Sequence, residues 1–158
     1  MERLRSISRQ LRRLVRMAPE RRALLVEAAL CLVLARAALV LVPFPRLARR
    51  LGRFVPPSDA RVSHARSEGS PDHVRLASEV AWAVTRAARH VPFSAVCLPQ
   101  AMAARFMLAR RGVDSVLHFG AAKGRDKPLD THAWLDAAGV EVTGYPASAD
   151  FADIACFV

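Results

Sequence analysis

Cys97 is the residue of this sequence whose type and setting best suit nucleophilic catalysis. Pro99 follows two positions later. Proline is tolerated in a helix only in the first turn, so a helix is predicted to begin at or just after Cys97. The positive end of a helix dipole favours the reactive thiolate of a cysteine placed there. We therefore predict that Cys97 is a nucleophile.

The first turn of the same helix also offers oxyanion-binding groups. Its backbone N–H groups have no partner within the helix and point toward the position of Cys97. We assign substrate or oxyanion contacts to Leu98 and Gln100 on this basis. The Gln100 side chain has a second interpretation, which is that it braces the helix, and we favour bracing.

A nucleophilic cysteine needs a base, usually a histidine from elsewhere in the fold. His132 begins a predicted strand after the loop over residues 123–128, which is a suitable place to present a ring to the helix. We predict that His132 is the base. His118, on the preceding predicted strand, is the alternative base, although a structural role suits it better.

The histidine in turn needs an orienting partner. Asp136 faces the same side of the strand as His132, but four residues of strand span about 13 Å, so the two cannot touch. A two-residue turn at 138–139 would place His132 opposite Gly144 and Tyr145, and neither is an acid. Asp150 and Asp153 follow closely and both stay open as candidates. We assign the orienting role to Asp150.

The remaining chemistry-bearing residues predict no metal and no cofactor. Cys31 and Cys156 are predicted to pack in the interior. The sequence has no Cys-x-x-Cys pair, no histidine pair at ligand spacing and no glycine-rich phosphate loop. Three scattered cysteines also do not make a disulfide scaffold, so we expect a reducing, cytoplasmic compartment.

The hydrophobic spacing predicts helices first and an antiparallel sheet afterwards, which is an α+β fold. We expect a basic helical N-terminal region over residues 1–55, a polar linker over 56–71 and a catalytic domain over 72–158. The predicted helices cover residues 1–16, 20–42, 46–54, 71–91 and 97–111. The predicted strands cover residues 113–122, 131–137, 140–145 and 153–158.

The charge of the chain is concentrated at one end. The formal net charge is +10, and residues 1–55 contain 13 Arg against 3 acids, whereas the rest is balanced. Such a segment suits an anionic surface, an acidic partner or plain solvation. The apolar run 23–44 contains Glu27 and Arg36, which favours a buried or amphipathic helix over a membrane span.

Three stretches, taken in order, resemble one known family. They are residues 91–101 with Cys97-Leu98-Pro99-Gln100-Ala101, residues 110–120 with Phe119-Gly120, and residues 131–139 with His132-Ala133-Trp134. This pattern is similar to the lasso-peptide leader peptidase family, the transglutaminase-like C-terminal domain of microcin-processing proteins. A cysteine that begins a helix and faces a histidine on a sheet is also the arrangement of papain and the transglutaminases.

The resemblance implies a cysteine peptidase that removes the leader from a lasso-peptide precursor. Cys97 and His132 match the catalytic cysteine and histidine of the family, but the position of the usual acid is Gly144. The expected partners are the precursor peptide, a separate leader-binding recognition protein and a macrolactam cyclase. Residues 1–55 are expected to dock to these proteins or to an inner membrane surface.

Two alternatives stay open. One is a non-catalytic adaptor whose basic N-terminal helices bind a membrane surface or an acidic partner. The other keeps the same site but transfers the acyl group to an amine, as a transglutaminase or acyltransferase does. A nucleic-acid binder is disfavoured, because aromatic residues make up only 6% of the chain and do not alternate with the arginines.

Overall fold

The structure is a computed structural model of the chain, and it describes residues 17–67, 69–123, 129–147 and 151–158. The predicted helix over residues 1–16 therefore lies outside the described part. In the described part the helices are α2 (Pro19–Leu41), α3 (Phe44–Leu51), α4 (Ala60–Arg66), α5 (Pro71–Ala88) and α6 (Cys97–Ala109). The strands are β1 (Phe54–Val55), β2 (Val116–Lys123), β3 (Leu129–Ala137), β4 (Val140–Thr143) and β5 (Ala152–Phe157).

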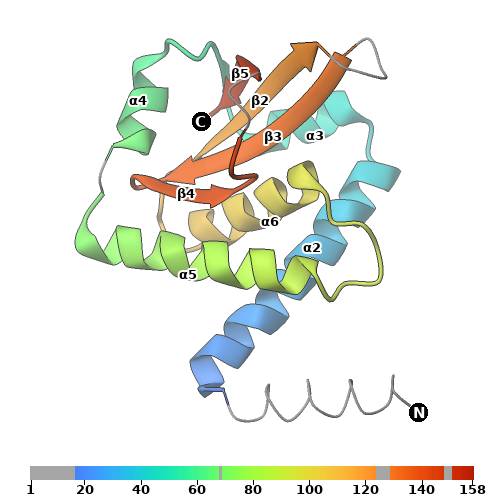
Figure 1. The fold of residues 1–158 in the computed structure, drawn as a ribbon, viewed down its shortest axis with the longest axis vertical. Helices are drawn as coiled ribbons and strands as arrows, with labels where there is room; N and C mark the ends of the chain where they lie inside the picture. Colours follow the sequence, from blue (N-terminus) through green and yellow to red (C-terminus); the bar gives the residue numbers. More distant parts are fainter. Residues whose placement is uncertain (1–16, 68, 124–128, 148–150) are drawn as a thin grey trace.

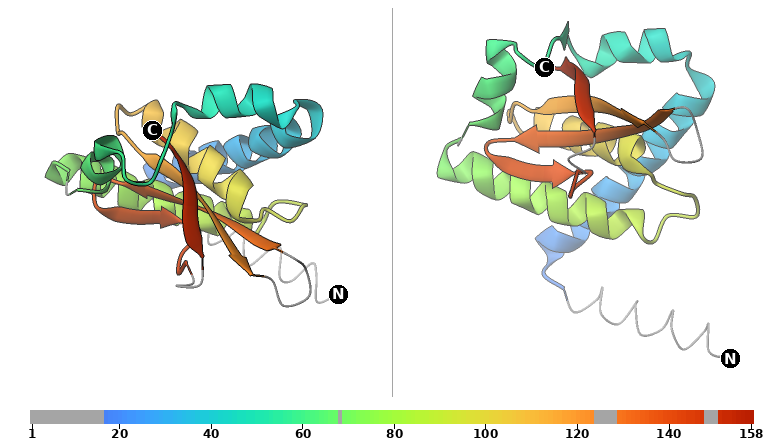
Figure 2. Two further views of the ribbon diagram at one scale, coloured as in Figure 1. Left: turned by 90° about the horizontal axis from the view of Figure 1, so that it is seen from above. Right: turned by 45° about the horizontal axis from the view of Figure 1, so that its top comes forward.

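The strands form one antiparallel sheet in the order β1-β5-β2-β3-β4, and α4, α5 and α6 contact it. Figure 1 shows α5 and α6 beside the sheet and α2 crossing both of them. In Figure 2, α6 lies between the sheet and α2. The α+β prediction is confirmed, with helices first and an antiparallel sheet afterwards.

Local sequence signals explain where the main elements begin and turn. The Ser70 hydroxyl accepts a hydrogen bond from the backbone N–H of His73, and Pro71 stands in the first turn of α5. The β3–β4 hairpin turns at Ala138 and Gly139, whose φ angles of 51° and 77° are typical of a two-residue turn. The predicted hairpin at these two residues is therefore confirmed.

Alternation along β2 separates two buried layers. Leu117 and Phe119 face the main core, which α2, α5 and α6 complete. Val116 faces the other way and joins a small cluster with Val55, Val62 of α4 and Cys156. The sheet is thus covered on one face by the large helices and on the other partly by α4.

The predicted linker over residues 56–71 and the predicted separation at that point differ from the structure. The segment contains the helix α4, and Arg66 of that helix contacts Asp136 of β3. Leu32 of α2 and Leu47 of α3 are buried in the same core as α5 and α6. One core therefore extends across the predicted boundary and includes side chains of α2 and α3.

The helix α2 is long and apolar enough to cross a membrane by length and composition alone. Its buried face contains Leu25, Ala28, Leu32 and Ala35, which pack into the core. The opposite face exposes further apolar side chains, among them Leu30 and Leu34. The burial of one face agrees with the prediction of a buried or amphipathic helix. Much of the apolar surface on the other face of α2 remains uncovered.

Candidate functional site

Cys97 is the first residue of α6, as the position of Pro99 predicted. Val96 precedes the helix in an extended conformation, and the Cys97 thiol is half-buried and free of any disulfide. Pro99 has no N–H, and the N–H of Gln100 bonds weakly to the Val96 carbonyl at 3.4 Å. Among the described residues, no acceptor outside the helix is found for the N–H groups of Cys97 and Leu98. These two groups are the available oxyanion donors of the first turn.

Gln100 braces the chain before the helix. Its side-chain Nε2 donates to the Ala95 carbonyl at 2.6 Å. The amide is thus engaged with the loop that leads into Cys97, although the residue also lines the cleft in which the thiol lies. This contact supports the bracing interpretation over direct contact with a substrate carbonyl.

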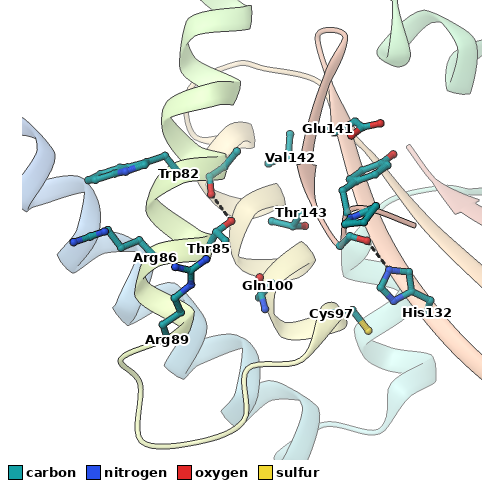
Figure 3. Close-up of a pocket in the computed structure, with 14 residues that line it drawn as sticks. Trp82, Thr85, Arg86, Arg89, Cys97, Gln100, His132, Glu141, Val142 and Thr143 are labelled. Atoms are coloured by element: carbon teal, nitrogen blue, oxygen red, sulfur yellow. Dashed lines mark hydrogen bonds between the residues drawn. The ribbon is translucent and has the colours of Figure 1, made fainter. Parts of the chain in front are cut away.

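His132 lies in β3 and shares an open cleft of about 630 Å³ with Cys97. Figure 3 shows the thiol and the imidazole beside each other at one end of this cleft. The wall formed by α5 carries Trp82, Arg86 and Arg89, and the opposite wall is formed by β4 and the residues that follow it. The fold therefore brings together the two side chains that were predicted to react.

The orienting partner of His132 is a backbone carbonyl. The ring nitrogen Nε2 lies 2.6 Å from the carbonyl oxygen of Gly144. A carbonyl only accepts, so Nε2 must carry the proton, and in the neutral ring Nδ1 is then the unprotonated nitrogen. Gly144 stands where the resemblance places an acid, and its backbone carbonyl accepts the hydrogen bond that the acid would have accepted.

Aromatic packing fixes the plane of the His132 ring. Trp134 stacks on it with centroids 5.9 Å apart, and Phe151 contacts it at 5.3 Å. The glycine at 120 makes room for this stack, because a Cβ atom there would meet the Trp134 ring at 2.6 Å. Phe119-Gly120 and His132-Ala133-Trp134, which are separate motifs in the sequence, thus belong to one packing unit.

The predicted acids are placed differently. Asp150 lies outside the described residues. Asp153 accepts from His118, with Oδ2 at 2.6 Å from Nδ1, and so it does not serve His132. Of the two acids that the sequence left open, Asp153 pairs with His118 because the two residues lie on the paired strands β5 and β2.

A second set of reactive residue types lies on the same face of β2 and β3 as His132, beyond Trp134, whose ring stacks on both His118 and His132. His118 is fully buried, its Nδ1 lies 3.4 Å from Cys156 Sγ, and its Nε2 lies 3.2 Å from Asp136 Oδ2. That last pair is within ion-pair distance but not aligned as a hydrogen bond. Burial, together with Asp153, raises the pKa of the Cys156 thiol to about 12. A buried thiol held in its neutral form has no access to a substrate, so this set is structural.

The same side chains also approximate a metal-binding triad. Ligand atoms of His118, Asp153 and Cys156 all lie within 4.8 Å of one another. As they stand, however, the histidine nitrogen and the carboxylate oxygen are in direct contact at 2.6 Å. Two ligands of one tetrahedral ion with bonds of about 2.0 Å would be separated by about 3.3 Å. The contact is therefore a hydrogen-bonded pair, and it leaves no space for an ion.

A helix that starts at a cysteine, packs against an antiparallel sheet and faces a strand histidine defines a transglutaminase-like domain. The chain belongs to the transglutaminase-like superfamily, whose family model matches residues 38–156. This superfamily typically contains cysteine-dependent enzymes. Comparisons with curated proteins and with solved structures give no significant match.

Proposed function

We propose that this protein is a cysteine peptidase that removes the leader from a lasso-peptide precursor. The observation that carries the proposal is the shared cleft, where Cys97 at the N-terminus of α6 lies beside His132, whose Nε2 is bonded to Gly144. The superfamily supports a thiol chemistry, and the resemblance of residues 91–101, 110–120 and 131–139 to leader peptidases supports the substrate.

The geometry supports acyl transfer to the thiol. His132 Nδ1 accepts the Cys97 proton, and the thiolate attacks the carbonyl carbon of the scissile peptide bond. The N–H groups of Cys97 and Leu98 donate to the oxyanion that forms. The His132 imidazolium then protonates the departing amine, which leaves the leader as a thioester on Cys97.

Hydrolysis completes the cycle. His132 Nδ1 takes a proton from water, the resulting hydroxide attacks the thioester carbon, and the leader departs with a free carboxylate. The proton returns to the Cys97 sulfur. The freed amine of the core peptide is the group that a separate macrolactam cyclase would use.

The open shape of the cleft suits an extended peptide. Its walls come from α5 on one side and from β4 and the Gly144–Pro146 segment on the other. The described residues show basic side chains at the α5 wall, Arg86 and Arg89, and one acid, Glu141, at the other wall. We propose that a separate leader-binding protein delivers the precursor to this cleft, inside a reducing cytoplasm.

Cys97→Ala and His132→Ala test the assignment. Each change should abolish cleavage of the precursor in the presence of the leader-binding partner, because it removes the nucleophile or the base. The fold should be kept, since both side chains lie at the cleft surface. Liquid chromatography with mass spectrometry measures the product, and circular dichroism checks the fold.

Two matched variants serve as controls. Cys31→Ala removes a thiol from the core, and His64→Ala removes an exposed ring on α4; both should cleave like the unaltered protein. Normal cleavage by Cys97→Ala or His132→Ala would refute the proposal. A product joined to an amine instead of a shortened peptide would reassign the same site to a transferase.

A further inference from the structure

The segment around Gly144, which orients His132, is held by a second contact to β3. Tyr145 follows Gly144 directly, and its phenol donates a hydrogen bond to Asp136 Oδ1. Burial raises the pKa of the Tyr145 phenol, and Asp136 raises it further, so the group stays protonated and remains a donor. The bond ties the residue after Gly144 to β3, the strand that carries His132.

Asp136 has two charged or titratable neighbours besides Tyr145, both at ion-pair distance. Its side chain is 7% exposed, and Oδ2 is 3.1 Å from Arg66 Nε and 3.2 Å from His118 Nε2. His118 is held in turn by Asp153 on β5 at 2.6 Å. Side chains of α4 and β2 thus surround the carboxylate that accepts from the Tyr145 phenol, and β5 holds His118 beside it.

The backbone at Gly144 passes too close to β3 to allow a side chain. Its φ of 83° lies in the left-handed region, and a Cβ atom would lie 2.5 Å from the Ala133 carbonyl oxygen. The backbone thus passes close against Ala133 and Trp134. The Tyr145–Asp136 bond and the close approach to Ala133 restrain the Gly144 backbone, whose carbonyl oxygen accepts from His132 Nε2.

We propose that Tyr145 and Asp136 are a positioning pair for the reaction at Cys97, which rests on the peptidase function proposed above. The pair holds the Gly144 carbonyl where it bonds His132 Nε2, and so it keeps Nδ1 on the side of the thiol. A buried network beside His132, on the same face of β2 and β3, thereby takes over the role that a catalytic acid has in related sites. Neither side chain touches the reacting atoms.

Tyr145→Phe tests this pair with little change to the cleft. The ring stays and the phenol is lost, so KM should stay within about twofold while kcat falls roughly 10- to 100-fold, because a small displacement of a catalytic group has that effect. Alkylation of Cys97 by iodoacetamide, read by mass spectrometry, should slow as well. This second measurement needs no peptide substrate.

A pair of variants at Asp136 separates positioning from stability. Asp136→Asn keeps an oxygen that accepts from Tyr145, whereas Asp136→Ala does not, so the Asn variant should retain more of kcat than the Ala variant. This comparison also replaces Tyr145→Phe if that variant fails to fold. Val62→Ala is the matched control, because it weakens the same side of the sheet without touching Tyr145. It should lower the Tm and leave kcat unchanged.

The outcomes distinguish the two proposals. If His132→Ala leaves the alkylation rate of Cys97 unchanged, both the peptidase and the positioning pair are overturned. If alkylation and cleavage depend on His132 but Tyr145→Phe and Asp136→Ala keep the kcat of the unaltered protein, only the positioning pair is refuted.

A separate observation concerns the exposed face of α2. Apolar side chains recur on it at three- and four-residue spacing, each 46–78% exposed: Val26, Leu30, Val33, Leu34, Val40 and Leu41. The fifteen steps from residue 26 to residue 41 make a stripe about 22 Å long. Contiguous apolar surface of this kind marks an interaction site.

The charges around the stripe indicate what covers it. The helices α2 and α3 contain six exposed arginines that have no ion-pair partner among the described residues: Arg21, Arg22 and Arg36 of α2 and Arg46, Arg49 and Arg50 of α3. Of the two acids of α2, Glu27 is neutralised by Arg110 and Arg111, and Glu20 lies in the first turn. An apolar face beside unpaired arginines is typical of a helix that lies in the plane of an anionic lipid surface.

We propose that α2 and α3 dock the protein on an anionic membrane surface, with the α2 stripe inserted at the interface. The buried face of α2 stays in the core, so the helix lies along the surface and does not cross it. Co-sedimentation of the full chain with vesicles of phosphatidylglycerol and phosphatidylcholine measures this binding.

Leu30→Gln with Leu34→Gln, and Arg46→Gln with Arg49→Gln and Arg50→Gln, should each weaken binding. The triple arginine change should weaken it roughly 100-fold, since each arginine near an anionic surface contributes about 1 kcal/mol. Equal binding to pure phosphatidylcholine vesicles would overturn the proposal. So would a homodimer in solution that the two leucine changes dissociate, because a second copy would then cover the stripe.

Discussion

At the residue scale, the site depends on a glycine where a carboxylate was expected. The Gly144 carbonyl accepts from His132 and defines which ring nitrogen is free to take a proton. A peptide oxygen carries no full charge, so it stabilises the imidazolium less than an aspartate would. The orientation of the base is preserved, while part of the electrostatic support is absent.

An acid introduced at this position should nevertheless reduce activity, for a steric reason. Gly144→Asp and Gly144→Ala both place a Cβ atom against the Ala133 carbonyl and force a left-handed φ on a residue that avoids it. We expect both variants to lose cleavage activity and about 1–3 kcal/mol of unfolding free energy. Urea denaturation and the cleavage assay measure the two effects, and a more active Gly144→Asp variant would contradict the orienting role of the Gly144 carbonyl.

At the element scale, α2 has two apolar faces with different roles. The face with Leu32 packs on α5 and α6, and the face with Leu30 is open. Glu27 joins the helix to α6 through Arg111, at 2.6 Å, and this contact lowers the pKa of the Glu27 carboxyl. A helix anchored in this way is a structural part of the domain and not an appendage.

A pair of leucine variants checks this division. Leu32→Ala should cost about 2–5 kcal/mol of unfolding free energy, because it opens a cavity in the core. Leu30→Ala, two residues earlier, should change stability by less than about 0.5 kcal/mol, since its side chain is 60% exposed. Equal losses from the two variants in chemical denaturation would show that α2 packs with a different face.

At the scale of the whole molecule, His132 and a buried group of reactive residue types share one face of β2 and β3. Cys97 and His132 line the cleft, whereas Cys156, His118 and Asp136 are buried beyond Trp134 and do not line it. Tyr145 connects them, because it lines the cleft and bonds to Asp136. The buried group therefore supports the exposed one.

The local signals in the sequence located most of the elements and indicated where Cys97 and His132 lie within them. Pro99 located the start of α6, and the turn at 138–139 predicted that residues 144 and 145 lie near His132, whose Nε2 bonds the Gly144 carbonyl. Proline and positive-φ turns restrict the backbone within a few residues, so their effect is independent of the rest of the fold. The two-residue β1 had no such signal, and the short helix α4, although capped by Asp59, lies in a polar segment that was predicted as a linker, so both were missed.

Only the tertiary structure decided which groups serve His132 and where α2 belongs. A backbone carbonyl has no residue type to search for, and Asp153 pairs with His118 because of the register of β2 and β5, which no local pattern specifies. Glu27 and Arg36 favour a buried or amphipathic helix over a membrane span, but the sequence of α2 does not say which segments cover its apolar face. Its packing against α5 and α6 depends on contacts between segments far apart in the sequence, and such contacts form only when the whole chain folds.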